Sequence, residues 1–182
     1  EALRLLSAGM ENTIVTYDMF FRELPDSGGF AVMSCLQQLI EKLSDISFSE
    51  EELESLREQG FSEALIEYLG NFEFCCDVYA MPEGTPVFPN EPIVKVIGPA
   101  IQAQFIETMV LLTINHQSLI ATKAARVCYA AQGDGVMEFG LRRAQGPDAG
   151  LYGARAAMIG EFPLTRYKVC LIASTCGSTA AF

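Results

Sequence analysis

The stretch "VMEFGLRRAQGPDAGLYGARAA", Val136 to Ala157, is the part of this sequence that decides its fold class. A short apolar run ends in two adjacent arginines, a Gly-Pro-Asp turn follows, and an alanine- and glycine-rich segment completes it. These patterns predict a strand, a loop and a helix in that order. In α/β folds, ligands bind at the carboxyl ends of strands. The stretch therefore predicts a ligand site at the two arginines.

The predicted site binds an anion. Arg142 and Arg143 are expected at the end of the strand, beside a helix that Asp148 is expected to cap. Guanidinium groups and free helix N–H groups together bind phosphate or carboxylate. Successive strand residues face opposite ways, so we expect the two arginines to have different partners. The alternative is a functionless surface pair. The pattern of 138–141 argues against it, because it is typical of a buried strand that would hold the arginines at the edge of a cleft.

Charge is distributed unevenly along the 182 residues, half of which are apolar. The net charge of −11 argues against general binding to nucleic acid or to an anionic membrane surface. Residues 1–120 contain 19 acidic and 5 basic residues, whereas residues 121–182 contain 4 acidic and 7 basic ones. A local basic site in an acidic chain predicts a small anionic ligand rather than a polyanion.

The six cysteines form no C-x-x-C pair, and His116 is the single histidine. These features argue against a zinc or iron–sulfur site, and we expect no metal ligands. The thiols are expected to be reduced and mostly buried, as in an intracellular protein. Cys75 and Cys76 are expected on opposite faces of a strand. Apolar runs are far shorter than the roughly 20 residues of a spanning helix, so no membrane crossing is expected.

The first seventy residues predict helices around one strand. A helix ending at Gly9 is followed by a strand within 13–24, a turn at 26–29 and a helix over 30–46. Two further helices are expected after the capping serines Ser49 and Ser62, with Gly60 and Gly70 as terminators. Ser49 and Glu52 have the spacing of a capping box.

The middle of the chain predicts a proline-punctuated β-meander over 72–98, then a helix of about 30 residues from Pro99, ended by "QGDG" at 132–135. His116 lies on that helix, where it is either a catalytic base or, as we favour, a packed histidine. The meander also resembles half of a lipoyl-type carrier domain. Carriers present their modified lysine at a hairpin tip, but Lys95 is expected in mid-strand, which argues against a carrier.

Four blocks of sequence together resemble the nicotinate phosphoribosyltransferase family. They are "YDMFFRELPDSGGFAV" (17–32), "DVYAMPEGTPVFPNEPIVKVIGP" (77–99), "ETMVLLTINHQSLIATKAARV" (107–127) and "EFGLRRAQGPDAGLYGARAA" (138–157). They occur in the family's order, and the resemblance covers about residues 13–160. It implies a type II phosphoribosyltransferase fold of the α/β (α+β) class. Residues 1–133 would form an N-terminal α/β sandwich domain, and 134–182 the incomplete start of an irregular α/β barrel.

The resemblance also implies a reaction. Family members join nicotinate to phosphoribosyl pyrophosphate, which yields nicotinate mononucleotide and diphosphate for NAD biosynthesis. ATP is a co-substrate, Mg²⁺ accompanies the diphosphate, and the enzymes are cytoplasmic dimers. Arg142, Arg143 and Asp148 would bind substrate, and Phe139 would stack on the pyridine ring, although a core aromatic is an open alternative.

The sequence departs from the family after Gly160. The family's phosphorylated histidine lies beyond that point, and residues 161–182 do not resemble the family's continuation. We therefore expect a truncated enzyme with a non-family tail, weak or inactive alone. The alternative is a non-catalytic dimerisation or regulatory fragment of the same enzyme.

Overall fold

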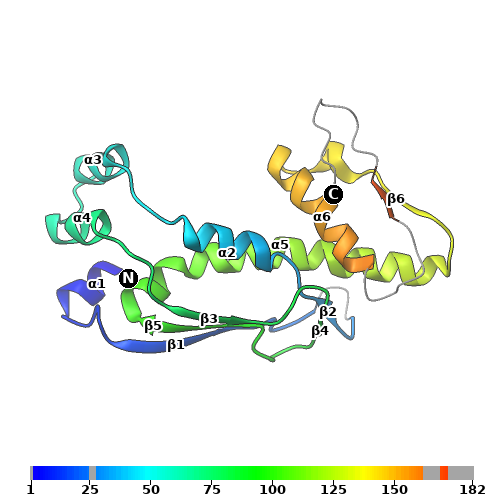
Figure 1. The fold of residues 1–182 in the computed structure, drawn as a ribbon, viewed down its shortest axis with the longest axis horizontal. Coiled ribbons are helices and arrows are strands. Elements are labelled where there is room, and N and C mark those ends of the chain that lie inside the picture. The colour runs from blue at the N-terminus through cyan, green and yellow to red at the C-terminus, as the bar shows by residue number, and fades with distance from the viewer. Residues whose placement is uncertain (1, 25–27, 162–168, 172–182) are drawn as a thin grey trace. The chain divides into compact units, whose positions relative to one another are not determined.

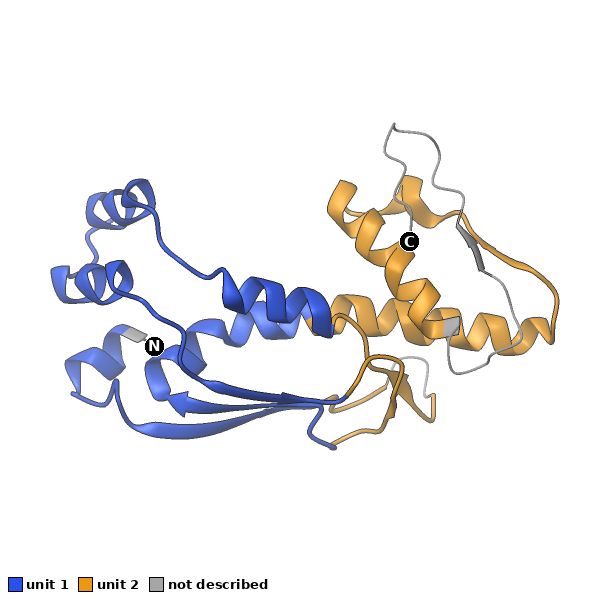
Figure 2. Ribbon diagram, in the orientation of Figure 1, with its two compact units in different colours: residues 1–20, 36–81, 91–113 blue, residues 21–35, 82–90, 114–182 orange. Residues whose placement is uncertain are grey.

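The computed structural model describes residues 2–24, 28–161 and 169–171. Helices and strands are mixed along the chain, which confirms the predicted α/β class. The chain divides into two compact units (Figure 2). Unit 1 comprises residues 1–20, 36–81 and 91–113, and unit 2 comprises residues 21–35, 82–90 and 114–182. These two units do not test the predicted domain boundary after residue 133, which stays a prediction.

Figure 1 labels the helices α1 to α6 and the strands β1 to β6. In chain order the elements are α1 (Ala2–Ser7), β1 (Ile14–Met19), β2 (Ala31–Val32), α2 (Leu36–Ser44), α3 (Glu50–Glu58), α4 (Glu63–Gly70), β3 (Asp77–Ala80), β4 (Pro86–Val87), β5 (Val94–Pro99), α5 (Ala100–Ala131), β6 (Val136–Glu138), the 3₁₀ helix η2 (Gly140–Arg143), α6 (Pro147–Glu161) and β7 (Val169–Leu171).

Unit 1 is built on an antiparallel sheet with strand order β1-β5-β3. Its register pairs Tyr17 and Val78 with Val96, so these three side chains lie on one face of the sheet. The opposite face carries Lys95 opposite Asp18, with Lys95 Nζ 3.4 Å from Asp18 Oδ1. Lys95 therefore lies in the middle of the central strand, as expected, and not at a hairpin tip.

The predicted meander is wrong in its connectivity. β3 pairs directly with β5, whereas the intervening β4 pairs with β2 in a separate two-stranded sheet. The reason is that the two-residue strand Pro86–Val87 pairs with Ala31 and Val32, which lie far away in the sequence. It does not pair with the strands that flank it in the chain.

The helix caps predicted in unit 1 are largely confirmed. The Ser49 side chain accepts from the Glu52 N–H, and the Glu52 carboxylate accepts from the Ser49 N–H at 2.8 Å, which completes the capping box. Ser62 caps α4, and Gly60 has φ +83°. Gly70 is not the terminator, however, because it is the last helical residue and Asn71 is the C-cap.

The expected helix over 30–46 begins only at Leu36. Val32 N–H donates to Thr122 Oγ1 at 2.8 Å, and Ser34 N–H donates to Ser118 Oγ at 3.1 Å. These bonds, together with the β2–β4 pairing, hold residues 31–34 extended within unit 2. Cys35 has φ +79°. The apolar spacing in the sequence matched a helix, but long-range hydrogen bonds decided the conformation.

The long helix α5 confirms the prediction for 100–131, and the chain leaves it through Gln132 (φ +46°) and Gly133 (φ +112°). Pro99 closes β5 rather than beginning the helix. The expected packing of His116 is wrong, because its side chain is exposed. The buried apolar side chains of α5 in unit 2 lie on another face, at Ile114, Ala121, Ala125 and Cys128.

In unit 2, β6 and β7 pair in parallel with α6 between them in sequence, which is a β-α-β unit. The helix α6 packs on α5, where Ala156 joins Ala121, Ala125 and Val32 in one buried cluster. None of the described helices is long and apolar enough to span a bilayer.

Candidate anion site on the loop before α6

Arg142 and Arg143 lie on η2 rather than at the end of a strand, which corrects the predicted placement. The strand β6 stops at Glu138, whose carboxylate accepts a hydrogen bond from the Gly140 N–H. This local bond turns the chain out of the extended conformation, and Ala144 N–H closes the turn on Leu141 O at 3.1 Å. Both arginines are thus carried on a short 3₁₀ turn.

The side chains of this loop face solvent. Phe139 is 59% exposed, Arg142 and Arg143 are exposed, and the expected burial of the 138–141 segment is wrong. Within the described part of the chain, neither guanidinium forms an ion pair or hydrogen bond. An exposed aromatic ring therefore lies near two cations whose donors are available to an anion.

The start of α6 follows this turn closely. Gly146 has φ +100°, which favours glycine, and Pro147 is the first residue of the helix. Asp148 is exposed and lies in the first turn instead of at the N-cap. Its carboxylate interacts favourably with the helix dipole there, as a bound anion would.

Gly150 fixes η2 against α6, a role that the sequence reasoning missed. A Cβ built on Gly150 would lie 2.2 Å from Leu141 Cδ1, so only glycine permits this packing without a shift of the leucine. The contact places the arginine turn beside the first turns of α6. The signal in the sequence was the run of small residues at 149–157, which indicates close helix packing.

A second charged feature of unit 2 was also missed. Arg155 Nη1 donates to Glu83 Oε1 at 2.9 Å and Arg155 Nη2 donates to Glu83 Oε2 at 2.7 Å. The two side chains are only 27% and 22% exposed. This ion pair joins α6 to the turn before β4. The sequence contains no signal for this pair, because the arginine lies in an alanine-rich helix and the glutamate in a proline-rich turn far away along the chain.

Gly28 in the "DSGG" turn has a defined structural role in unit 2. A Cβ on Gly28 would lie 1.7 Å from Arg126 Nη2, and the same nitrogen donates to Phe30 O at 3.2 Å. The backbone at residue 28 therefore passes directly over the Arg126 guanidinium. The rest of the predicted turn, residues 25–27, lies outside the described residues.

The cysteines and the acidic side chains build no metal centre in the part of the chain that the structure describes. Cys35 and Cys128 are buried, Cys75 is exposed, and Cys76 is partly buried, and no disulfide joins any of these four within the described residues. Cys75 and Cys76 precede β3 and are not strand residues. Burial raises the pKa of the Cys76 thiol to about 11. Cys176 and the side chain of Cys170 lie outside the described residues.

Comparison with known proteins identifies the family. Residues 2–115 match the model of the nicotinate phosphoribosyltransferase N-terminal domain. The chain is 44% identical over 151 residues to a nicotinate phosphoribosyltransferase of Mycobacterium tuberculosis, and 43% identical over 158 residues to that of Bacillus subtilis. These alignments cover 82% and 86% of the chain but 32% of each relative.

The fold leads to the same family. The crystal structure of human nicotinic acid phosphoribosyltransferase matches with a TM-score of 0.80 and 32% identity, over 87% of this chain and 33% of the human one. The chain thus spans about a third of the length of the relatives that it matches. On these grounds the chain belongs to the nicotinate phosphoribosyltransferase family.

Proposed function

We propose that the chain is part of a nicotinate phosphoribosyltransferase, a transferase that forms nicotinate mononucleotide and diphosphate from nicotinate and phosphoribosyl pyrophosphate in NAD biosynthesis. Its location would be cytoplasmic. Family membership supports the reaction. The observation that carries the proposal is the exposed turn with Phe139, Arg142 and Arg143 beside the start of α6. All the substrates are anionic, and this turn offers two free guanidinium groups.

The proposed chemistry needs positioning more than covalent help. Transfer through an oxocarbenium-like centre is accelerated when the leaving diphosphate is held and its charge is neutralised. Arg142 and Arg143 would bind the diphosphate or the nicotinate carboxylate, and the Phe139 ring would stack on the pyridine. Asp148, in the first turn of α6, would orient one of the two guanidinium groups toward the substrate.

We also propose that the reaction uses Mg²⁺ and ATP. Mg²⁺ would accompany the diphosphate and be held by its oxygens. ATP would serve as a co-substrate. We also propose a homodimer, as the resemblance implies.

Calorimetric titration of the chain with phosphoribosyl pyrophosphate and Mg²⁺ tests the site. Arg142→Ala and Arg143→Ala should each weaken binding about tenfold, because each removes a charge-assisted hydrogen bond. Arg57→Ala is the matched control, since Arg57 is an exposed arginine of unit 1. Equal affinity for all four proteins would refute the arginine roles. A radiolabelled nicotinate assay measures turnover, which we expect to be weak for this chain alone.

A second candidate function is a non-catalytic fragment that pairs with a full-length copy. Its support is the apolar surface that unit 1 exposes, with Ile14 66% and Leu112 68% exposed. Co-purification of the tagged chain with a full-length family member tests it. Association without any binding of phosphoribosyl pyrophosphate would favour this function over the enzymatic one.

A further inference from the structure

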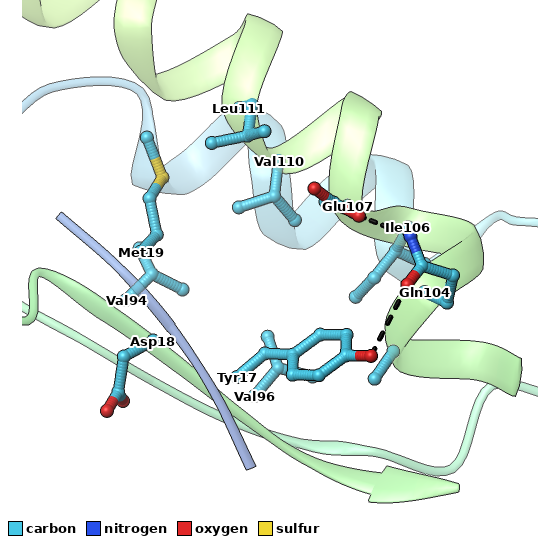
Figure 3. Close-up of a pocket in the computed structure, with 11 residues that line it drawn as sticks. Tyr17, Asp18, Met19, Val94, Val96, Gln104, Ile106, Glu107, Val110 and Leu111 are labelled. Carbon is cyan, nitrogen blue, oxygen red and sulfur yellow. Dashed lines mark hydrogen bonds between the residues drawn. The ribbon is translucent and has the colours of Figure 1, made fainter. Parts of the chain in front are cut away.

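Unit 1 contains a cavity that the proposed reaction does not use. It has a volume of about 320 Å³ and lies between β1 and β5 of the sheet and the first turns of α5 (Figure 3). This is about the volume of ten water molecules in the liquid, at the small end of the range for ligand pockets. It can enclose one small organic molecule.

The floor of the cavity is apolar. Val94 and Val96 of β5 are 1% and 6% exposed, and Ile106 of α5 is fully buried. Ala103 and Val110 complete this surface. A ligand that covers it must itself have an apolar body, because a polar group placed here would lose its hydrogen bonds to water.

One wall is a hydrogen-bonded relay of three side chains, which Figure 3 shows. Tyr17 Oη donates to Gln104 Oε1 at 3.3 Å, and Gln104 Nε2 donates to a carboxylate oxygen of Glu107. Both donors therefore point along the relay toward the carboxylate. The Glu107 carboxylate has further acceptor capacity, which it offers to a ligand.

The charge of the cavity has one sign. Among the residues that the structure describes, no lysine, arginine or histidine lines it. Asp18 contributes backbone to the lining, but its carboxylate points away from the cavity and pairs with Lys95 on the opposite face of the sheet. Glu107 is thus the charged group that a ligand meets. Nicotinate and phosphoribosyl pyrophosphate are anions, and this carboxylate would repel them.

We propose that this cavity is a binding site for a small organic monocation, an ammonium or amidinium group on an apolar body. The body would cover the valine and isoleucine floor, and the cationic N–H groups would donate to Glu107. The Tyr17 ring, which Figure 3 shows beside the cavity, would add a cation–π contact. The site is independent of the arginine turn and of the reaction proposed for it.

Methyl-resolved NMR of the chain, titrated with benzylammonium, benzyl alcohol and benzoate, tests the proposal. These probes share one ring and differ in charge. Saturable shifts are expected at the methyl groups of Val94, Val96, Val110 and Leu111 with benzylammonium, weaker shifts with the alcohol, and none with benzoate. Glu107→Gln should weaken benzylammonium binding about tenfold.

Two further variants keep the test decisive. Glu58→Gln removes the same charge from an exposed helical position and should leave binding unchanged. Tyr17→Leu keeps the apolar wall but removes the aromatic face, so it should also weaken binding, and it serves if Glu107→Gln fails to fold. The proposal is overturned if benzoate binds as well as benzylammonium, if Glu58→Gln weakens binding as much as Glu107→Gln does, or if the cavity methyl groups do not respond to millimolar benzylammonium.

Discussion

Arg155 and Glu83 join α6 to the turn before β4 through two parallel hydrogen bonds between guanidinium and carboxylate. The pair lies within unit 2, with both side chains about three-quarters buried. A planar fork makes both bonds at once, whereas a lysine ammonium acts as a single point charge. The helix that carries the arginine turn at its N-terminal end is therefore held by a specific geometry, not only by charge.

Arg155→Lys should lower the free energy of unfolding by about 1–2 kcal/mol, because one of two bonds to a partly buried carboxylate is lost. Urea denaturation measures the change. Arg57→Lys is the control, since that arginine pairs with Glu54 at the surface and its replacement should change stability far less. Equal effects of the two substitutions would contradict the role of the buried pair.

Gly160→Ala should destabilise unit 2. A Cβ at Gly160 would lie 2.1 Å from the carbonyl oxygen of Ala121, and backbone cannot move aside as a flexible side chain can. We expect a loss of about 1–3 kcal/mol, as for other overpacked positions. Gly135→Ala is the control, because nothing lies within 4 Å of its Cβ position. A thermal unfolding midpoint for Gly160→Ala at or above that of Gly135→Ala would disprove the close contact.

Stability should depend on pH through the cap of α3. Hydrogen bonds from the Ser49 backbone and side chain lower the pKa of Glu52. A carboxyl whose pKa is lower in the folded state stabilises the fold above its unfolded pKa and loses that effect as pH falls through the folded value. The stability difference between the parent chain and Glu52→Gln should therefore stay constant from about pH 7 to about pH 5 and shrink below that, toward about pH 3.

Urea midpoints at several pH values measure this difference. Glu91→Gln, which changes an exposed loop glutamate, is the control and should show a difference that varies little with pH. A gap between the parent chain and Glu52→Gln that stays constant across the acid range would show that the capping bond does not act on the ionised form.

The neighbouring thiols Cys75 and Cys76 should react at different rates. Alkylation needs the thiolate, and Cys76 is partly buried with a pKa raised to about 11, whereas Cys75 is exposed. With iodoacetamide at about pH 8, we expect Cys75 to be modified at least about tenfold faster. Peptide mass spectrometry over time measures both rates. Comparable rates in the folded chain, as in urea, would contradict the burial of Cys76.

Local signals in the sequence predicted local structure correctly. The capping box of Ser49 and Glu52 depends on groups three residues apart, and α5 is a run of 32 residues without a helix-breaking glycine or proline. Gly9 and Gly60 adopt the left-handed conformations expected of helix terminators. The family also followed from the sequence, because it is identified by four short motifs and their order along the chain, and neither depends on knowing the fold.

The failures lie where distant residues decide the conformation. The spacing of Val32, Cys35 and Leu36 suits a helix, but Thr122 and β4 hold Val32 in a strand. The sequence analysis missed the 3₁₀ turn of Arg142 and Arg143. The strand ends early because the Gly140 N–H donates a hydrogen bond to the Glu138 carboxylate.

The sequence by itself therefore determined the α/β class, the caps, the long helix and the family, because each rests on neighbouring residues or on ordered motifs. Only the tertiary structure decided which face of α5 is buried, that Glu83 meets Arg155, and that a cavity opens beside Glu107. The physical reason is that these features depend on partners far apart in the chain, whose pairing no local pattern encodes.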